Sequence, residues 1–257
     1  PNGTFSTNGT GDCTDVVPGK QAVDSTSAYV STGAVNQASC SNGHYNLNGD
    51  GACIQVAAGY VASTSSAATN TQATCSTAQC THAAPCPDGS FKSAAGAGSC
   101  DDVDDGKFGS KNGSVYTDEG ATSEINCPPG FYNTNGEGPC DEVPAGQVGV
   151  TTSVSDAITQ LSGADQIVPC TNGYFRANDG PGDCNAVPAG HRGVTKTGAY
   201  AATGAVAVEP CPNGTFSTNG TGDCTDVDPG KQAEKSGAYV STGAVNQASC
   251  SNGHYNL

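Results

Sequence analysis

Large apolar residues recur along this chain at long, regular intervals, without the short period of an amphipathic helix or a half-buried strand. An aromatic residue stands five positions after a cysteine in each repeat, and a valine stands three positions after a second cysteine. These are the only large apolar residues that every repeat has, so we expect them to form a miniature core. The pattern predicts short, irregular strands and almost no helix, with residues 157–161 (AITQL) as one weak helical candidate.

Glycines and cysteines define the repeat. Each repeat reads Cys, then Gly at +3, an aromatic at +5, G-x-G-x-C, x-x-V-x-x-G, a variable loop and Gly-Ala seven residues before the next cysteine. Glycines at fixed offsets mark positive φ angles or close backbone approaches, and pairs such as Asn48-Gly49 and Asn135-Gly136 predict tight turns between short strands. The repeat divides the chain into modules 1 to 7, at residues 1–39, 40–85, 86–126, 127–169, 170–210, 211–249 and 250–257.

Module 2 departs from the rule, because it lacks Gly-Ala and carries an extra pair, Cys75 and Cys80. Module 6 copies module 1: aligning 212–257 on 1–47 with a single gap leaves four differences in 46 pairs. This copy indicates a super-repeat of five modules. It also predicts that the chain is a window from a longer tandem array.

Composition indicates that disulfides are needed for folding. Leu, Ile, Val and Phe make up only 34 of 257 residues, and the net charge is −15, which is typical of disordered chains. Fourteen regularly spaced cysteines offset this deficit and favour disulfides over zinc. A disulfide closing a loop of this size adds about 3 kcal/mol, too little to order a module alone, so we expect modules to stack on their neighbours in an elongated rod. The fold class is therefore small, disulfide-rich, mostly β and irregular.

Two pairing schemes fit the spacing, and Cys75–Cys80 belongs to both. One links each module to the next through 13–40, 53–86, 100–127, 140–170, 184–211 and 224–250. The other closes each hairpin and leaves Cys13 and Cys250 to partners outside the window, with pairs Cys40–Cys53, Cys86–Cys100, Cys127–Cys140, Cys170–Cys184 and Cys211–Cys224.

Charge and sequons bear on partners and compartment. Disulfides and five N-x-S/T sequons predict an extracellular or cell-surface glycoprotein with N-linked glycans. The chain is also rich in Ser and Thr, so O-linked glycans are predicted as well. The sequons are at Asn2, Asn8, Asn112, Asn213 and Asn219. The acidic balance argues against nucleic acid, and no apolar run could span a membrane. Asp101, Asp102, Asp104 and Asp105 form a weak candidate for calcium, for which a solvated acidic loop is the simpler interpretation.

The motif C-P-x-G-x-[FY]-x7-8-C-x-x-V-P-A-G resembles the cysteine-rich repeats of ephrin-receptor-like and tumour-necrosis-factor-receptor-like modules, as in protist surface proteins such as ciliate immobilisation antigens. Cys127 through Tyr132, Cys140 and Val143 through Gly146 carry the likeness, as do Cys184, Val187–Gly190 and Cys211–Phe216. Those families read C-x-x-C-P-x-G, whereas Val stands for the second cysteine here. The resemblance implies an elongated extracellular rod, and its disulfide topology supports the hairpin-closing scheme.

No catalytic, phosphate-binding or dinucleotide motif occurs in the sequence, so we predict no enzyme and no cofactor. The favoured function is a structural subunit of an extracellular filament or surface coat, such as a protist flagellar hair, with copies of itself as partners. The alternative is a stalk or ligand-binding ectodomain that displays variable loops, with 62–85 as its best recognition loop. A simpler interpretation of that loop is a local staple that replaces the missing Gly-Ala contact.

Overall fold

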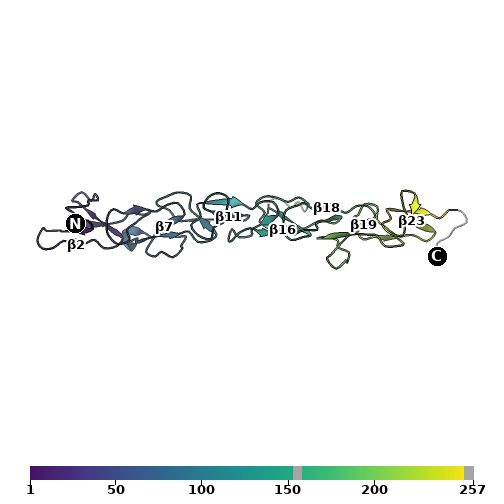
Figure 1. Ribbon diagram of the computed structural model, residues 1–257, viewed down its shortest axis with the longest axis horizontal. Coiled ribbons are helices and arrows are strands. Elements are labelled where there is room, and N and C mark those ends of the chain that lie inside the picture. Colours follow the sequence, from purple (N-terminus) through teal and green to yellow (C-terminus); the bar gives the residue numbers. More distant parts are fainter. Residues whose placement is uncertain (153–157, 252–257) are drawn as a thin grey trace. The chain divides into compact units, whose positions relative to one another are not determined.

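The computed structural model describes residues 1–152 and 158–251. The chain falls into two compact units, Pro1–Ile125 with Asn135–Pro139, and Asn126–Thr134 with Cys140–Leu257. Both units consist of small antiparallel hairpins, drawn as short arrows in Figure 1. Six disulfides and almost no helix confirm the predicted class, a disulfide-rich fold of β and irregular structure.

Each of the first six modules begins with a hairpin of two-residue strands that holds the aromatic residue. In module 2, for example, Tyr45 lies opposite Ile54. These pairs are β1 (Thr4–Phe5) with β2 (Thr14–Asp15), β5 (His44–Tyr45) with β6 (Ile54–Gln55), β9 (Ser90–Phe91) with β10 (Asp101–Asp102), β13 (Phe131–Tyr132) with β14 (Asp141–Glu142), β17 (Tyr174–Phe175) with β18 (Asn185–Ala186), and β21 (Thr215–Phe216) with β22 (Thr225–Asp226).

A longer hairpin follows in each module and bears the variable loop at its tip. In module 4, Val148 lies opposite Val168. These pairs are β3 (Lys20–Val23) with β4 (Asn36–Ser39), β7 (Tyr60–Ser63) with β8 (His82–Pro85), β11 (Lys107–Ser110) with β12 (Ser123–Asn126), β15 (Gln147–Val150) with β16 (Gln166–Pro169), β19 (His191–Val194) with β20 (Ala207–Pro210), and β23 (Lys231–Lys235) with β25 (Asn246–Ser249), where β24 (Ala238–Tyr239) adds a third strand.

The core of each module is small, as its composition requires. Val16, Val56, Val103, Val143 and Val187 are at most 4 % exposed, whereas the aromatic residues are only half-buried. The predicted core residue is therefore mainly the valine, which packs with the half-buried aromatic and with buried alanines and cysteines. Cores of this size bury little apolar surface, so covalent and main-chain contacts between elements matter more than in an ordinary domain.

Two local predictions were wrong. Residues 158–161 are not helical, while residue 157 lies outside the described residues; the one helix among the described residues is α1 (Cys75–Ala78), inside the odd loop. Asn48-Gly49 does not form a tight turn either, because it lies in the long connection of residues 46–53. Gly49 is needed there because a Cβ would lie 2.1 Å from the carbonyl oxygen of Val16 in the preceding module.

Candidate functional site

The feature that recurs most regularly is the contact between one module and the next, which we call the joint. In the module pairs 1–2, 2–3, 4–5 and 5–6, the x-x-V-x-x-G segment of the first module ends in a positive-φ glycine whose N–H donates to a carbonyl oxygen in the second. The donor–acceptor distances are 2.7 Å for Gly19 to Asn46, 2.8 Å for Gly59 to Lys92, 2.9 Å for Gly146 to Arg176 and 2.7 Å for Gly190 to Ser217. The glycine carbonyl accepts in turn from the N–H of the next module's first cysteine, as for Cys211 at 2.8 Å.

Glycine is required in the joint for a second reason besides its φ angle. A Cβ at Gly190 would lie 2.3 Å from the carbonyl oxygen of Gly243, and one at Gly146 would lie 2.5 Å from that of Gly204. These oxygens belong to the Gly-Ala turn of the following module. The joint therefore brings two backbones together so closely that Gly146 and Gly190 leave no room for a side chain.

The joint also buries the residue six positions after the first cysteine, which sequence reasoning missed. In modules 3, 5 and 6, its N–H donates to the alanine carbonyl of the Gly-Ala turn, while its own carbonyl accepts from the glycine N–H of the preceding module. The side chain is 2–6 % exposed in modules 2 to 6, where it is Asn46, Lys92, Asn133, Arg176 or Ser217. The position was missed because its residue type changes from module to module, whereas its main-chain role does not.

Two of these buried side chains are cations that donate hydrogen bonds to carbonyl oxygens. Lys92 Nζ donates to the carbonyl oxygens of Ala94 at 2.7 Å and Gly96 at 2.8 Å, and burial lowers its pKa. Arg176 Nη1 donates to three carbonyl oxygens of module 4, those of Val143, Pro144 and Gln147. Burial lowers the pKa of Arg176, although Asp179 and Asp183 act in the opposite direction.

Module 2 forms its joint with module 1 through the extra cysteine pair. Gln79 lies seven residues before Cys86, the place of the missing glycine, and adopts a positive φ of 51°. Cys80 takes the place of the alanine, and its carbonyl accepts from the N–H of Asn46 at 3.1 Å. Cys75 and Cys80 are fully buried and bonded to each other. The odd loop thus completes the joint, and its disulfide points inward.

The disulfides are those of the hairpin-closing scheme. Each ties the first cysteine of a module to the cysteine that precedes the second strand of its short hairpin: Cys40–Cys53, Cys86–Cys100, Cys127–Cys140, Cys170–Cys184 and Cys211–Cys224. Cys13 and Cys250 are free thiols in this chain, the first exposed and the second half-buried. Their pairing with cysteines outside the chain stays a prediction.

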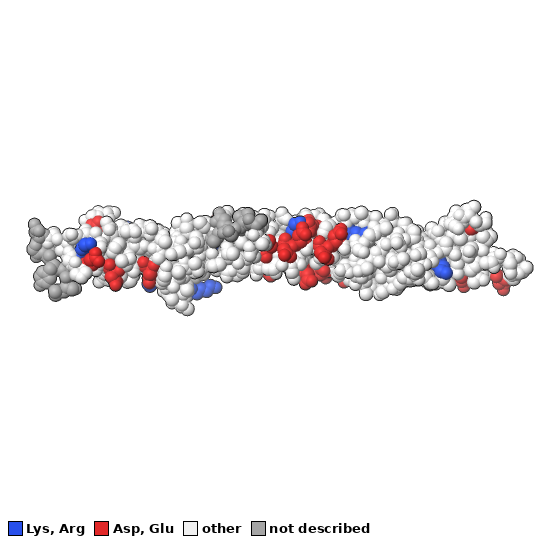
Figure 2. Space-filling view, turned by 180° about the vertical axis from the view of Figure 1, so that it is seen from behind, with Lys and Arg blue, Asp and Glu red and all other residues white. Residues whose placement is uncertain are grey.

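The remaining predicted sites are at the surface. All five sequon asparagines, Asn2, Asn8, Asn112, Asn213 and Asn219, are exposed. In the acidic cluster, Asp104 pairs with Lys107 at 2.8 Å, and Lys107 also binds Glu124. Within residues 1–152 and 158–251, no three acidic, histidine or cysteine side chains gather in a group that could hold a metal ion. Acidic side chains outnumber basic ones on the face in Figure 2.

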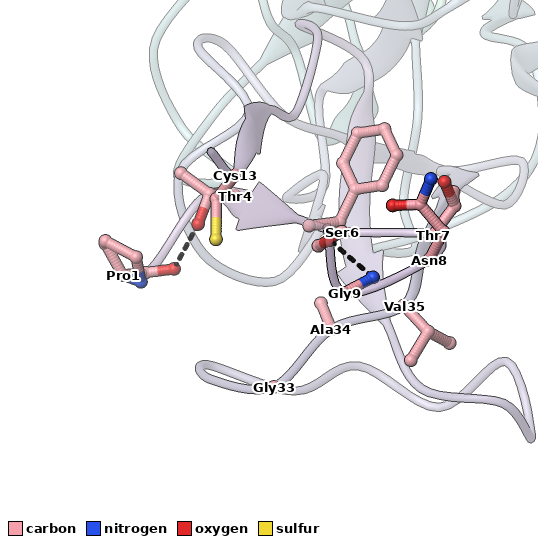
Figure 3. Close-up of a pocket in the computed structure, with 11 residues that line it drawn as sticks. Pro1, Thr4, Ser6, Thr7, Asn8, Gly9, Cys13, Gly33, Ala34 and Val35 are labelled. Carbon is pink, nitrogen blue, oxygen red and sulfur yellow. Dashed lines mark hydrogen bonds between the residues drawn. The ribbon is translucent and has the colours of Figure 1, made fainter. Parts of the chain in front are cut away.

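A cavity of ≈ 470 Å³ lies over module 1 and is lined by Phe5 through Gly9, by Gly33 through Val35, and by Pro1, Thr4 and Cys13 (Figure 3). In module 1, Ser6 N–H donates to the carbonyl of Ala34 at 3.1 Å, as the buried residue does in other modules. The cavity is therefore the receiving side of a joint.

A comparison with protein-family models finds no match, and neither does a comparison with curated protein sequences. The site consists of main-chain hydrogen bonds that recur between successive modules. No helix in the described part of the chain has the length and apolar character needed to cross a bilayer. The disulfides are typical of secreted or extracellular proteins.

Proposed function

We propose that this chain is a structural repeat protein of an extracellular, glycosylated filament or cell-surface coat, without catalytic activity. In this proposal, modules of about 41 residues stack end to end into an elongated rod with a super-repeat of five modules. Copies of the chain associate along or beside one another, and the sequon asparagines carry glycans. A flagellar-hair-type fibre of a protist is one assembly of this kind.

The observation that carries the proposal is the recurrence of the joint. The same glycine N–H to carbonyl bond joins modules 1 to 2 and 2 to 3 in the first unit, and 4 to 5 and 5 to 6 in the second. In each of these four pairs, the earlier module gives a loop to the later one. A contact that repeats in one direction generates a linear array, which suits a fibre better than a closed globular assembly.

The alternative function, display of variable loops by a stalk, has one observation in its favour. The hairpin tips of modules 3 and 6 are exposed, with Val115 69 % and Tyr239 57 % accessible. The loop of residues 62–85 is less suited to recognition than its extra cysteines suggested, because its disulfide is buried in the joint. The display function therefore depends on the tips at residues 111–115 and 235–239.

Negative-stain electron microscopy of native material, purified without reductant, tests the proposal. Long fibres with a regular axial repeat are expected. Separate short rods, or rods attached at one end to membrane, would contradict the filament and favour the display ectodomain. Mass measurement before and after enzymatic removal of N-glycans tests the glycoprotein part separately, with a mass decrease as the expected result.

A further inference from the structure

We propose that Tyr29 and Tyr239 each hold the first sugar of an N-glycan, the first on Asn2 and the second on Asn213. This inference rests on the proposed glycoprotein function and names the protein surface that the sugar contacts. Asn213 stands two residues after the first cysteine of module 6, and Asn2 is its counterpart in module 1. The two tyrosines lie near the tips of the longer hairpins of the same modules, Tyr239 in β24.

In both modules the tyrosine hydroxyl donates a hydrogen bond to the side-chain oxygen Oδ1 of the asparagine. The oxygen–oxygen distance is 3.3 Å for Tyr29 to Asn2 and 3.3 Å for Tyr239 to Asn213. The hairpin tip that carries Tyr29 is one residue longer than that of Tyr239 and differs from it in sequence. Two different tips thus bring a tyrosine to the same asparagine atom, one in each compact unit.

The same contact occurs in module 3, which has modules before and after it in the chain. There Tyr116 donates to Asp88, which holds the position of the asparagine and is exposed. Asn172, at this position in module 5, is exposed as well. The position faces solvent in modules that have a neighbour on either side in the sequence. The exposure of Asn2 and Asn213 is therefore a property of the module.

Attachment of a sugar leaves the tyrosine contact intact. N-glycosylation replaces one hydrogen of Asn Nδ2 by a bond to the anomeric carbon of an N-acetylhexosamine, while the lipid diphosphate of the sugar donor leaves and a proton is released. Oδ1 is unchanged and still accepts from the tyrosine. Within residues 1–152 and 158–251, Nδ2 of Asn2 and of Asn213 donates no hydrogen bond. Since Nδ2 and Oδ1 share one carbon, the first sugar begins beside the tyrosine hydroxyl.

The tyrosine ring offers an apolar surface to that sugar. Tyr29 is 36 % and Tyr239 57 % exposed. A pyranose carries C–H groups on one face, and tyrosine combines an apolar ring with a polar end, which suits a contact that is partly in water. The hydroxyl bond alone is weak, because 3.3 Å is long for two oxygens. The sugar would therefore fix the tip of the longer hairpin to the start of its module.

The second sequon of module 6, at Asn219, is the matched control. It reads Asn-Gly-Thr, as the sequon of Asn213 does, and both asparagines are exposed. Asn219 Oδ1, however, accepts from the N–H of Thr221 at 3.1 Å, so this side chain folds back on its own turn. Among the described residues, no tyrosine hydroxyl donates to Asn219. A sugar on Asn219 is therefore not expected to hold the hairpin tip.

Amide hydrogen exchange of Val240 tests the proposal, because its N–H donates to the carbonyl of Ala233 next to Tyr239 in sequence. The 257-residue chain is secreted from eukaryotic cells, and an endoglycosidase trims each N-glycan to one sugar. Tyr239→Phe in the background removes the hydroxyl and keeps the ring. Asn213→Asp then removes the sugar, and module 3 shows that the fold accepts aspartate there. We expect exchange to become roughly fivefold faster, the size of one aromatic contact, and Asn219→Asp should leave it unchanged.

In a Tyr239→Ala background the sugar should no longer affect this exchange. Three results would overturn the inference: equal exchange with and without the sugar in Tyr239→Phe, an equal effect of the sugar in Tyr239→Ala, or an equal effect of Asn219→Asp. Mass spectrometry of each sequon separates these results from the proposed function. A glycan on Asn213 without an effect on exchange would reject the contact alone. A chain secreted without any N-glycan would reject the glycoprotein and the contact together, and sugar-dependent exchange without fibres in native material would reject the filament and leave the contact standing.

Discussion

Replacing Gly190 by alanine should weaken the joint between modules 5 and 6 far more than the same change at Gly214. Both glycines have positive φ, 80° and 79°, so each variant loses about 1–2 kcal/mol to the left-handed backbone. No atom lies within 4 Å of a Cβ position at Gly214, whereas the position at Gly190 is 2.3 Å from the Gly243 carbonyl oxygen. The Gly190 loop must therefore move away from module 6.

That movement breaks two main-chain hydrogen bonds, from Gly190 N–H to Ser217 and from Cys211 N–H to Gly190. At about 1 kcal/mol each, the additional loss is about 2 kcal/mol. We would measure it as amide hydrogen exchange of Cys211, because unfolding of a repeat array is not reliably two-state. Exchange in the Gly190→Ala chain should be roughly 30-fold faster than in the Gly214→Ala chain. Equal rates would refute the claim that close backbone approach stabilises the joint.

Three further predictions concern single residues. Gln79→Gly should stabilise the joint of modules 1 and 2 by about 1 kcal/mol in amide hydrogen exchange, because Gln79 holds a positive φ of 51° that glycine adopts without strain. An unchanged stability would mean that contacts of the Gln79 side chain offset the backbone strain. Burial and the hydrogen bond to Asp88 raise the pKa of Tyr116 to about 12, so its contribution to stability is complete below pH 10 and is lost between pH 10 and 12. Ultraviolet titration should show a phenol that ionises near pH 12, and Tyr116→Phe should remove that transition. Alkylation of the unreduced, denatured chain should label Cys13 and Cys250 alone, and label elsewhere would contradict the hairpin pairs.

The sequence predicted the parts of the fold that depend on residue type. Glycine and cysteine cannot be replaced where a positive φ or a disulfide is needed, so their spacing revealed the hairpins. The burial of Asn46, Lys92 and Arg176 was not predictable. The main-chain N–H and carbonyl of this position make the contacts between modules, so side chains of different types can stand there. The interpretation of the odd loop as a staple that replaces the Gly-Ala contact is confirmed, because the Cys80 carbonyl accepts from Asn46 N–H as the alanine carbonyl does elsewhere. The positive φ of Gln79 was not predictable, since glycine is the usual residue there.

Because the joint consists largely of main-chain groups, loops of different sequence form it. The V-P-A-G loop of module 5 fits module 6, and the different V-V-P-G loop of module 1 fits module 2. A gene encoding such an array can therefore gain or lose whole modules by unequal recombination, and every new junction is formed from parts that already fit. Selection on the number of modules can then act independently of selection on the contacts between modules.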